Sequence, residues 1–415
     1  MRAVIVGAGI GGPAAAMALQ RAGIEARVFE ARGPDEARGS YLTVASNGVD
    51  ALRAIGAEAA VGAGFPTPSS LMFSGTGKCL GRVPLGSTRP DRDASVTIKR
   101  ARLQAALRDE AARRGIAVAY HRRLVRAERA GAGIRAVFDD GSDAFGDLLI
   151  GCDGVHSRVR QSIDPHAPAP RYVGLLNFGG YTPGLRVGEP GTWQMIFGAR
   201  AFFGYVADAG GRDANGTIWF ANVPRHAVSR EERESTAPEH WRRWLIDLFQ
   251  DDRGPAADLI ARGELELAGD NTHDLRSVPV WHNDRMIVIG DAAHAPSPSS
   301  GQGASMAIED AVVLARCLRD ASVIPSAFAA FERLRRRRVE RIVTQGARSS
   351  SSKAAGPIAR IIRDHALPLV FRYVVTEKSM AWLYDHHIDF ESTVAIDDAG
   401  HVTNRTISPS YLSDR

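Results

Sequence analysis

The sequence predicts an α/β protein with a parallel-sheet domain, an inserted domain of mostly antiparallel β-strands and a C-terminal helical region. Three observations predict this class. Short apolar strands alternate with helical segments near the N-terminus, aromatic and glycine-rich strands gather between residues 173 and 224, and arginine-rich helical patterns follow residue 327. With 415 residues and 44% hydrophobic content, the chain can bury a large core and form two or three domains.

The first thirty residues have the pattern of strand, glycine turn, helix and second strand. Residues 2–6 are an apolar strand, Gly7-Ala8-Gly9-Ile10-Gly11-Gly12 matches G-x-G-x-x-G, and helix and strand patterns cover 13–22 and 26–30. In such a unit the glycines permit a tight turn, backbone approach to a pyrophosphate and close packing of helix on strand. Glu30 is placed to accept hydrogen bonds from ribose hydroxyls, which argues against a 2′-phosphate there. The unit therefore predicts a dinucleotide site, for either FAD or NAD.

The next elements are read from periodicity and turn residues. A Gly-, Ser- and Pro-rich excursion with a short strand at 71–73 occupies residues 62–90, and Asp139-Asp140-Gly141 predicts a hairpin between 134–138 and 147–150. The other elements predicted in this part are helices at 47–55 and 99–114 and a strand at 116–120.

The second half begins with the aromatic strands and ends in helices. Its predicted strands are 192–197, 202–207, 217–223 and 285–289. Its predicted helices are 231–248, 301–318 and 327–348, the last followed by a Ser-rich break at 349–352.

Charge and cysteine content restrict the function classes. The net charge of +5 and pI near 9.3 come from scattered arginines, so we do not predict nucleic-acid binding. The densest cluster, Arg333 and Arg335–Arg338 with Glu332, Glu340 and Arg341, is interpreted as a solvated helix face. Three widely spaced cysteines favour a reducing compartment, and neither a signal peptide nor a membrane span is predicted, so we expect a cytoplasmic protein.

Two later stretches also run from a buried strand into a turn. Residues 148–160 end their strand in Gly151-Cys152-Asp153-Gly154, which on its own is equally consistent with an ordinary turn. Residues 286–296 end theirs in Gly290-Asp291, and a loop through Gly301-Gln302-Gly303 then opens a helix. Ligands in open α/β sheets lie at the carboxyl ends of strands, so Asp291 can accept from sugar-chain hydroxyls while the glycine loop lies against a planar ring.

In this order, the three motifs resemble those of the para-hydroxybenzoate hydroxylase-like, single-component FAD monooxygenases, and the resemblance covers residues 1 to about 345. It implies a Rossmann-like FAD-binding domain with an inserted substrate domain. Residues 1–72, 97–170 and 275–345 would form the FAD-binding domain, 73–96 and 171–274 the substrate-binding β-sheet domain, and 346–415 a C-terminal helical region.

The resemblance also implies where FAD is held. The first glycine motif would bind its ADP half, Gly290-Asp291 its ribityl chain, and Asp153-Gly154 would serve both FAD and NAD(P)H. Arg38 resembles the arginine that follows the ribose acid, Arg100 resembles the arginine of an apolar-x-Arg-x-x-Leu segment that faces FAD, and Ser305 stands where asparagine is common. The expected FAD contacts are Gly7, Gly9, Ile10, Gly11, Gly12, Glu30, Ala31, Arg38, Arg100, Leu124, Asp153, Gly154, Gly290, Asp291, Pro296, Gly301, Gln302, Gly303 and Ala304.

The activity implied is hydroxylation of an aromatic or other electron-rich small molecule with NAD(P)H and O2, through a flavin C4a-hydroperoxide. Secondary metabolism is one setting for such an activity. In that chemistry the cofactor carries the difficult step. The alternatives left open are epoxidation or Baeyer–Villiger oxidation on the same scaffold, and a flavin reductase or dehydrogenase without oxygen transfer. A halogenase would need W-x-W-x-I-P, whereas the chain has Trp241-Arg242-Arg243-Trp244, and an NAD-binding module would not need the later motifs.

No catalytic residue or metal site is assigned from the sequence. The group that polarises a phenol could lie in the aromatic strands, where Tyr205, Gln194, His226 and Trp219 are candidates. His294 has no second ligand at metal spacing and is expected to pack under the flavin loop. The expected partners are an aromatic small molecule, NAD(P)H and O2, without nucleic acid or membrane insertion, in a monomer or homodimer.

Overall fold

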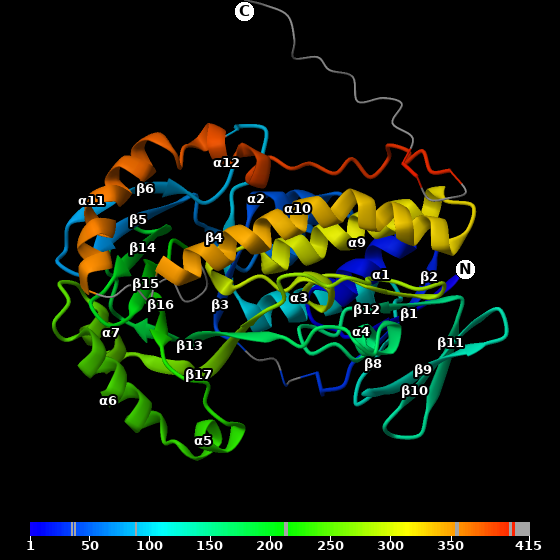
Figure 1. Cartoon of the computed structure of the whole chain (residues 1–415), viewed down its shortest axis with the longest axis horizontal. Coiled ribbons are helices and arrows are strands. Elements are labelled where there is room, and N and C mark those ends of the chain that lie inside the picture. Colours follow the sequence, from blue (N-terminus) through cyan, green and yellow to red (C-terminus); the bar gives the residue numbers. More distant parts are fainter. Residues whose placement is uncertain are drawn as a thin grey trace, which may run out of the picture.

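The computed structural model describes residues 1–34, 36, 39–87, 89–210, 215–352, 357–397 and 401–402, without the side chains of 349–361. Figure 1 shows two regions side by side, a parallel sheet with its helices and a larger, mostly antiparallel sheet. Long helices and the C-terminal segment run across both. The mixed α/β class predicted from the sequence is confirmed.

A five-stranded parallel sheet joins the three motif-bearing strands (Figure 1). Its spatial order is β18 (Met286–Val288), β12 (Leu148–Gly151), β1 (Arg2–Val6), β2 (Glu25–Phe29) and β8 (Val118–Ala119). Ile5 is in register with Ile150 on one side and Val28 on the other. Because the strands are parallel, β1, β12 and β18 carry their following loops to the same edge of the sheet.

Helices cover one face of this sheet, and a small antiparallel sheet covers the other. The helical layer contains α1 (Gly11–Arg21), α3 (Arg100–Arg113), α9 (Gly303–Asp320) and α10 (Ile324–Ser352). The opposite layer contains β9 (Leu124–Ala130), β10 (Gly133–Phe138) and β11 (Asp143–Gly146), beside α4 (Arg158–Ile163). The rings of Phe29 and Phe138 stack between β2 and β10, with centroids 4.7 Å apart.

The partner predicted for the Asp139-Asp140-Gly141 hairpin was wrong. Strand β10 pairs with β11, while residues 148–151 cross into the parallel sheet as β12. The run at 148–150 is buried on both faces, which is typical of a parallel strand, and the alternating exposure of β11 is typical of a half-exposed hairpin.

The larger sheet has seven strands. Their spatial order is β17 (Glu264–Asp274), β13 (Arg171–Pro183), β16 (Gly216–Pro224), β15 (Phe202–Ala207), β14 (Thr192–Phe197), β5 (Ser69–Ser74) and β6 (Cys79–Pro84). All neighbours are antiparallel except β14 and β5. One face packs on α6 (Pro238–Phe249) and α7 (Ala256–Arg262), with α5 (Arg230–Ser235) near β17. The single helix predicted at 231–248 is two helices, because Pro238 starts a new one.

Short elements connect the two regions, and two helices follow α10 in the part of the chain that the structure describes. The short elements are β3 (Tyr41–Val44), β4 (Phe65–Pro66) and β7 (Val96–Lys99) in one sheet, α2 (Ser46–Arg53), η1 (Glu58–Val61), α8 (Asp291–His294) and η2 (Pro298–Ser300). The C-terminal helices are α11 (Pro357–Tyr373), which packs on β6, and α12 (Glu377–Tyr384), which packs on α2 (Figure 1). In the part of the chain that the structure describes, no helix combines the length and apolar content needed to cross a membrane.

Candidate functional site

The turn between β1 and α1 depends on close backbone contacts. Gly7 has φ +103°, and a Cβ there would collide with the carbonyl oxygen of Cys152. A Cβ on Gly12 would collide with the carbonyl oxygen of Gly7, so the close packing predicted for Gly12 is present. Helix α1 begins at Gly11 without a side-chain cap and without an acid in its first turn. Its first amides and its positive dipole end therefore remain available to an anion.

Glu30 is held beside this turn by the backbone. Its Oε2 accepts from the amide of Ala8 at 2.7 Å, and its Oε1 accepts from the amide of Arg32 at 2.9 Å. Each oxygen keeps a further lone pair for a hydroxyl. Glu30 and Ala31 line a cavity together with Leu124, whereas Arg38 lies outside the described residues.

One face of helix α3 lines the same cavity. Arg100, Gln104 and Arg108 follow one another at i, i+4 and i+8, which places them on one side of the helix. The side-chain amide nitrogen of Gln104 lies 3.9 Å from a Cβ built on Gly9. Sequence reasoning found Arg100 but missed Gln104 and Arg108, although the four-residue spacing was a usable signal.

Both carboxylate oxygens of Asp153 accept hydrogen bonds from groups within the protein. Its Oδ1 accepts from the hydroxyl of Ser157 at 2.5 Å, and its Oδ2 accepts from the amides of Arg158 and Val159 at 2.7 and 3.1 Å. Burial raises the pKa of Asp153, and these hydrogen bonds oppose that effect. The carboxylate therefore fixes the start of α4 and leaves the Gly154 backbone beside the cavity.

The loop after β18 is fixed from behind by Asp310 on α9. Asp310 Oδ2 accepts from the amide of Gly290 at 2.8 Å and contacts Nε2 of the buried His294 at 2.6 Å. Gly290 has φ +59°, so its backbone favours glycine. Asp291 follows at the cavity, where burial raises its pKa, and Arg100 and His294 oppose that effect. His294 packs behind the loop, as predicted, and the described residues contain no cluster of metal ligands.

The loop from Pro296 to Ala304 leads into the uncapped start of α9. Gly301 has φ +62°, and a Cβ on Gly303 would stand 3.6 Å from the Pro296 ring. Gln302 is buried, and its Oε1 accepts from Nδ2 of Asn47 at 3.1 Å. Helix α9 begins at Gly303 with no acid in its first turn and no side-chain cap, so a second helix N-terminus meets the cavity.

A buried ionic network holds α9 against α10 behind this loop. Arg335, only 1% exposed, contacts Glu309 and Asp310 at 2.7 Å each. Arg338 donates to Glu309 at 2.8 Å and to the carbonyls of Trp382 and Leu383. The interpretation of this arginine cluster as a solvated face is thus wrong for Arg335 and Arg338.

The network should make the fold sensitive to acid. Arg335 and Arg338 hold the pKa of Glu309 well below its usual range, and His294 and Arg335 lower that of Asp310, against the opposing effect of burial. A carboxyl group whose pKa is lowered in the folded state contributes its full stabilisation of the fold at pH values above its ordinary pKa of about 4. This contribution is lost as the pH falls from that value toward the lowered pKa. Each unit of lowering contributes about 1.4 kcal/mol.

We expect the Tm of the wild type to fall steeply below about pH 4.5. Glu309→Gln should have a lower Tm at neutral pH but a shallower acid slope, measured by thermal melts from pH 7 to 3. Glu340→Gln, whose side chain is more exposed on α10, should keep the wild-type slope. Equal slopes in all three proteins would contradict this explanation.

The other end of the cavity has an apolar wall on the seven-stranded sheet. Trp193 is fixed there by a hydrogen bond from its Nε1 to Thr97 Oγ1 at 3.1 Å. The wall residues on the sheet are Met72, Val83, Trp193, Met195, Phe197, Phe202, Ile218 and Phe220. Side chains alternate along each strand, so the neighbouring residues face α6 and α7 instead.

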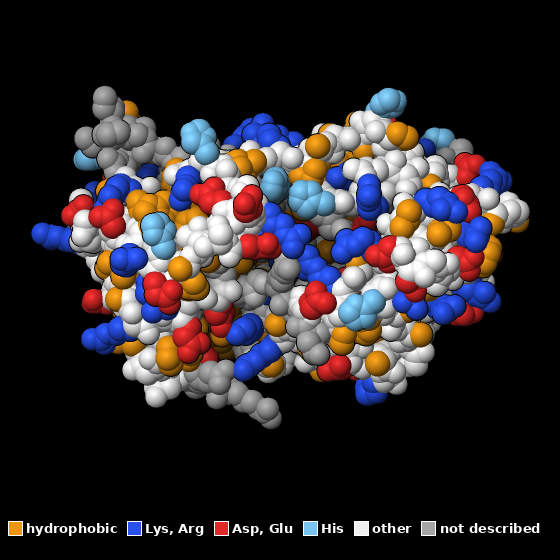
Figure 2. All heavy atoms as spheres, turned by 90° about the horizontal axis from the view of Figure 1, so that it is seen from below, with side chains coloured by type: hydrophobic (Ala, Val, Ile, Leu, Met, Phe, Trp, Pro, Cys, Tyr) orange, Lys and Arg blue, Asp and Glu red, His pale blue; other side chains and the backbone are white. Residues whose placement is uncertain are grey.

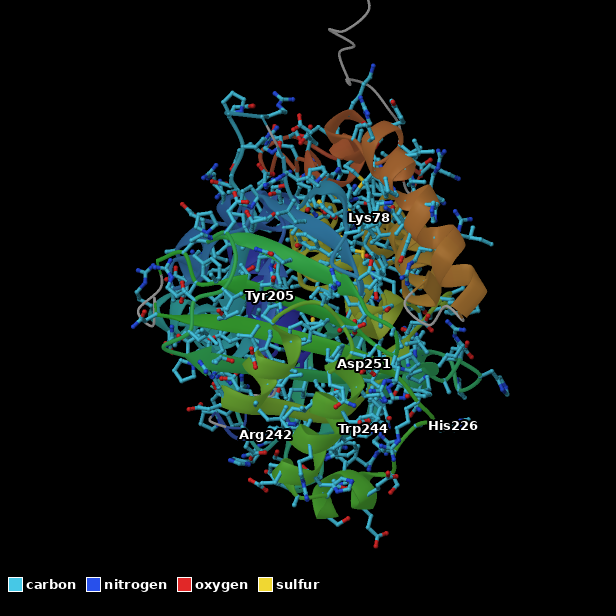
Figure 3. All side chains as sticks on the ribbon, turned by 90° about the vertical axis from the view of Figure 1, so that its left-hand side faces the viewer. Lys78, Tyr205, His226, Arg242, Trp244 and Asp251 are labelled. Carbon is cyan, nitrogen blue, oxygen red and sulfur yellow. The ribbon has the colours of Figure 1, made fainter. Side chains whose placement is uncertain are left out.

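This alternation determines which of the four residues suggested for phenol polarisation have side chains that face the cavity. Tyr205 donates to Gln194 at 2.9 Å, and neither residue lines the cavity. Trp219 lines the cavity, but its ring packs in the core against α6 and α7 and its Nε1 donates to Thr182. His226 is exposed at the margin of the sheet, away from Tyr205 at its centre (Figure 3). The side-chain polar groups of Tyr205, Gln194 and Trp219 are thus bonded within the protein, and His226 is not among the residues that line the cavity.

One cavity of about 1930 Å³ joins all these parts. Of the described residues expected to contact FAD, only Gly12 does not line it, because Gly12 packs beneath the turn. Arg38 lies outside the described residues. Figure 2 shows charged side chains of both signs and His side chains around a hollow between the two regions. His156 and His273 line the cavity with ring centroids 5.3 Å apart. Burial, the larger cause, and the neighbouring His273 both lower the pKa of His156.

The comparisons with known proteins agree with this geometry. Residues 1–345 match the family described as FAD binding domain. The chain is 30% identical over 337 residues to the aurachin C monooxygenase/isomerase of Stigmatella aurantiaca, covering 80% of this chain and 84% of that protein. It is 30% identical over 349 residues to the FAD-dependent urate hydroxylase of Klebsiella pneumoniae, covering 83% and 88%.

A solved structure has the same fold over most of its length. Klebsiella pneumoniae HpxO complexed with FAD and uric acid aligns with a TM-score of 0.76 and 25% identity, covering 92% of this chain and 97% of that one. The family predicted from the three motifs is therefore confirmed. This chain belongs to the FAD binding domain family, among the para-hydroxybenzoate hydroxylase-like flavoprotein monooxygenases.

Proposed function

We propose that this chain is an FAD-dependent monooxygenase that uses NAD(P)H and O2 to hydroxylate an aromatic or other electron-rich small molecule. The observation that carries the proposal is the single cavity that connects the glycine turn, the Gly290-Asp291 loop and the apolar wall. Its volume of about 1930 Å³ exceeds the roughly 1,000 Å³ upper range for one drug-sized ligand, which leaves room for a substrate beside a dinucleotide. The names of the relatives, a urate hydroxylase and an aurachin C monooxygenase, also favour oxygenation.

The donor set along the cavity fits FAD. A Cβ on Gly9 would meet only the far end of Gln104, so the backbone is open to the approach of a pyrophosphate. The uncapped start of α1 supplies amide donors for phosphate, and Glu30 supplies acceptors for ribose hydroxyls. At the other end, the start of α9 supplies amides beside Asp291 and a glycine loop.

We assign the ADP half of FAD to Gly7, Gly9, Ile10, Gly11, Glu30 and Ala31, with Gly12 packed beneath them. Arg100, Gln104 and Leu124 would flank it, and Arg38 keeps the role that the resemblance implies. Asp291 would bind the ribityl hydroxyls, and Pro296 with Gly301–Ala304 would lie against the flavin ring. Asp153 acts indirectly, because its carboxylate caps α4 and the Gly154 backbone is what faces the cofactor.

In this mechanism the protein binds, orients and excludes water. The chemistry that FAD would supply when bound is the acceptance of a hydride from NAD(P)H and the activation of O2. Asp310 fixes Gly290 and His294 from behind, so that Asp291 and the loop keep their positions during turnover. The apolar sheet face keeps water from the substrate, which suppresses unproductive loss of reducing equivalents.

We also propose a discontinuous FAD-binding domain of residues 1–72, 97–170 and 275–345, with 73–96 and 171–274 forming the substrate domain. Strand β5 begins at Ser69 and pairs with β14, which favours moving the first boundary back to about residue 68.

Asp291→Ala should weaken FAD binding by about 10- to 100-fold, because hydrogen bonds to a charged group contribute about 1.5–3 kcal/mol. The measurement is a titration of apoprotein with FAD, followed by quenching of flavin fluorescence. Asp284→Ala is the matched control, since that carboxylate is 74% exposed and has only a distant contact with Arg129. Wild-type affinity in Asp291→Ala would refute the ribityl assignment.

The function itself is tested by its cofactor and its stoichiometry. Purified protein should be yellow and should release FAD on denaturation. NAD(P)H and O2 consumption should rise together when a substrate from an aromatic panel is present, and the product should carry one oxygen atom from ¹⁸O2. A colourless protein that cannot take up FAD would refute the proposal, and NAD(P)H oxidation without incorporated oxygen would favour a reductase.

A further inference from the structure

The segment beyond the family match closes the substrate end of the cavity. Helices α11 and α12 lie across from the apolar sheet face, and Phe371 packs so closely on β6 that a Cβ on Gly81 would be 2.8 Å from it. Arg363 lies over the Phe197 ring, 4.6 Å from its centroid. The cavity residues from this segment are Leu367, Phe371, Val375, Met380, Leu383 and Tyr384.

This segment lies beside the loop assigned to the flavin ring. A Cβ on Gly346 of α10 would be 2.9 Å from Ser300 in that loop. The carbonyl of Tyr384 accepts from the hydroxyl of Ser46 at 2.9 Å, and the adjacent Asn47 donates to Gln302. Tyr384 is therefore tied, through α2, to the ring end of the cavity and not to the glycine turn.

Tyr384 has a hydroxyl group that forms no hydrogen bond with another described residue. The residue is 7% exposed and lines the cavity, and its hydroxyl has no hydrogen-bond partner among the described residues. The backbone around it is fixed, because the preceding carbonyls accept from Arg338 and His387 contacts Asp50 at 2.8 Å. Burial raises the pKa of Tyr384, so the phenol stays neutral and can donate a proton.

The rest of this wall carries no charge. No Lys, Arg, Asp or Glu is among the described cavity residues contributed by β5, β6, β14, β15, α11 and α12. Arg363 is paired with Asp364, and Arg338 with Glu309. A substrate carboxylate placed against this wall would lose its hydration without gaining a partner, which is costly.

We propose that Tyr384 orients the substrate by donating a hydrogen bond to a neutral oxygen, and that the wall of α11 and α12 selects an uncharged, largely apolar aromatic molecule over an aromatic carboxylate. This inference rests on the proposed function. It adds the substrate class and a specificity-determining residue that lies beyond residue 345.

The test uses the FAD-bound protein and two probes with the same ring system, 2-naphthol and 2-naphthoate. Binding is read as a change in the absorbance of the bound flavin, independently of turnover. We expect 2-naphthol to bind at least ten-fold more tightly than 2-naphthoate. Tyr384→Phe should weaken 2-naphthol binding about ten-fold while flavin content and Tm stay at wild-type values, because the hydroxyl bonds to no side chain or backbone group that the structure describes.

Tyr373→Phe is the matched control, since Tyr373 is 66% exposed on the outside of α11. It should bind both probes as the wild type does. Unchanged 2-naphthol binding in Tyr384→Phe, tighter binding of 2-naphthoate, or no response to 2-naphthol would each overturn the inference. Failure of the proposed function would appear separately, as wild-type protein that cannot take up FAD or that incorporates no oxygen from ¹⁸O2 with any substrate.

Discussion

Replacing Arg335 with alanine is expected to lower the free energy of unfolding by about 3–5 kcal/mol, because it leaves two buried carboxylates without their common partner. Arg335 bridges Glu309 and Asp310, and all three side chains are almost completely buried. Asp310 in turn fixes Gly290 and His294, so the loss should reach the loop assigned to the flavin. Urea unfolding followed by circular dichroism measures the change.

Arg337→Ala is the matched control on the same helix. Its side chain is exposed, so the substitution should change stability by no more than about 0.5 kcal/mol. FAD affinity should fall in Arg335→Ala and stay constant in Arg337→Ala. If the two variants were equally stable, the network would contribute nothing beyond surface charge, and the positioning role given to Asp310 would have to be abandoned.

The parallel sheet and its three motifs could be predicted because their signals are local. A buried strand, a glycine turn and a helix follow one another within about a dozen residues at Gly7, Asp153 and Gly290. Parallel pairing then brings all three turns to one edge, whatever the length of chain between them. For the same reason, strands β14 and β15 were predicted with the bounds that the structure has.

Features that depend on distant partners could not be predicted in this way. The partner of β10 follows from which of two short runs enters the parallel sheet, and a turn residue does not encode that choice. Whether Tyr205 or Phe202 meets the cavity depends on which face of the sheet α6 and α7 cover. Alternation along the strand places the two residues on opposite faces of the sheet, but it does not indicate which face lines the cavity and which packs on helices.

The apolar residues around the arginine cluster indicated that one face of the helix is buried, although the charge of the cluster favoured a solvated face. Phe328, Phe331, Val339 and Ile342 are buried at helical spacing on α10, and Arg335 falls in the same stripe. A charged residue within an apolar stripe indicates a buried ion pair as much as a solvated face. The acids that pair with it, Glu309 and Asp310, come from α9, so only the tertiary structure identifies them.

Two substitutions in the first glycine motif should separate folding from cofactor binding. Gly12→Ala places a Cβ against the carbonyl oxygen of Gly7, a backbone atom that cannot move without displacing α1 from β1. We expect apoprotein stability to fall by about 1–3 kcal/mol or more, and FAD retention to be lost with it. Thermal melts of the apoprotein and FAD titration measure the two effects.

Gly9→Ala should behave differently although it lies three residues away. Its Cβ would meet only the side-chain amide nitrogen of Gln104, at 3.9 Å, so the apoprotein should keep the Tm of the wild type. The added methyl group would occupy the space where a pyrophosphate must approach the backbone, and FAD affinity should fall at least ten-fold. Loss of affinity without loss of stability would locate the cofactor over Gly9, because a merely structural glycine cannot produce that combination. Wild-type FAD affinity in Gly9→Ala would instead mean that the dinucleotide binds elsewhere in the cavity.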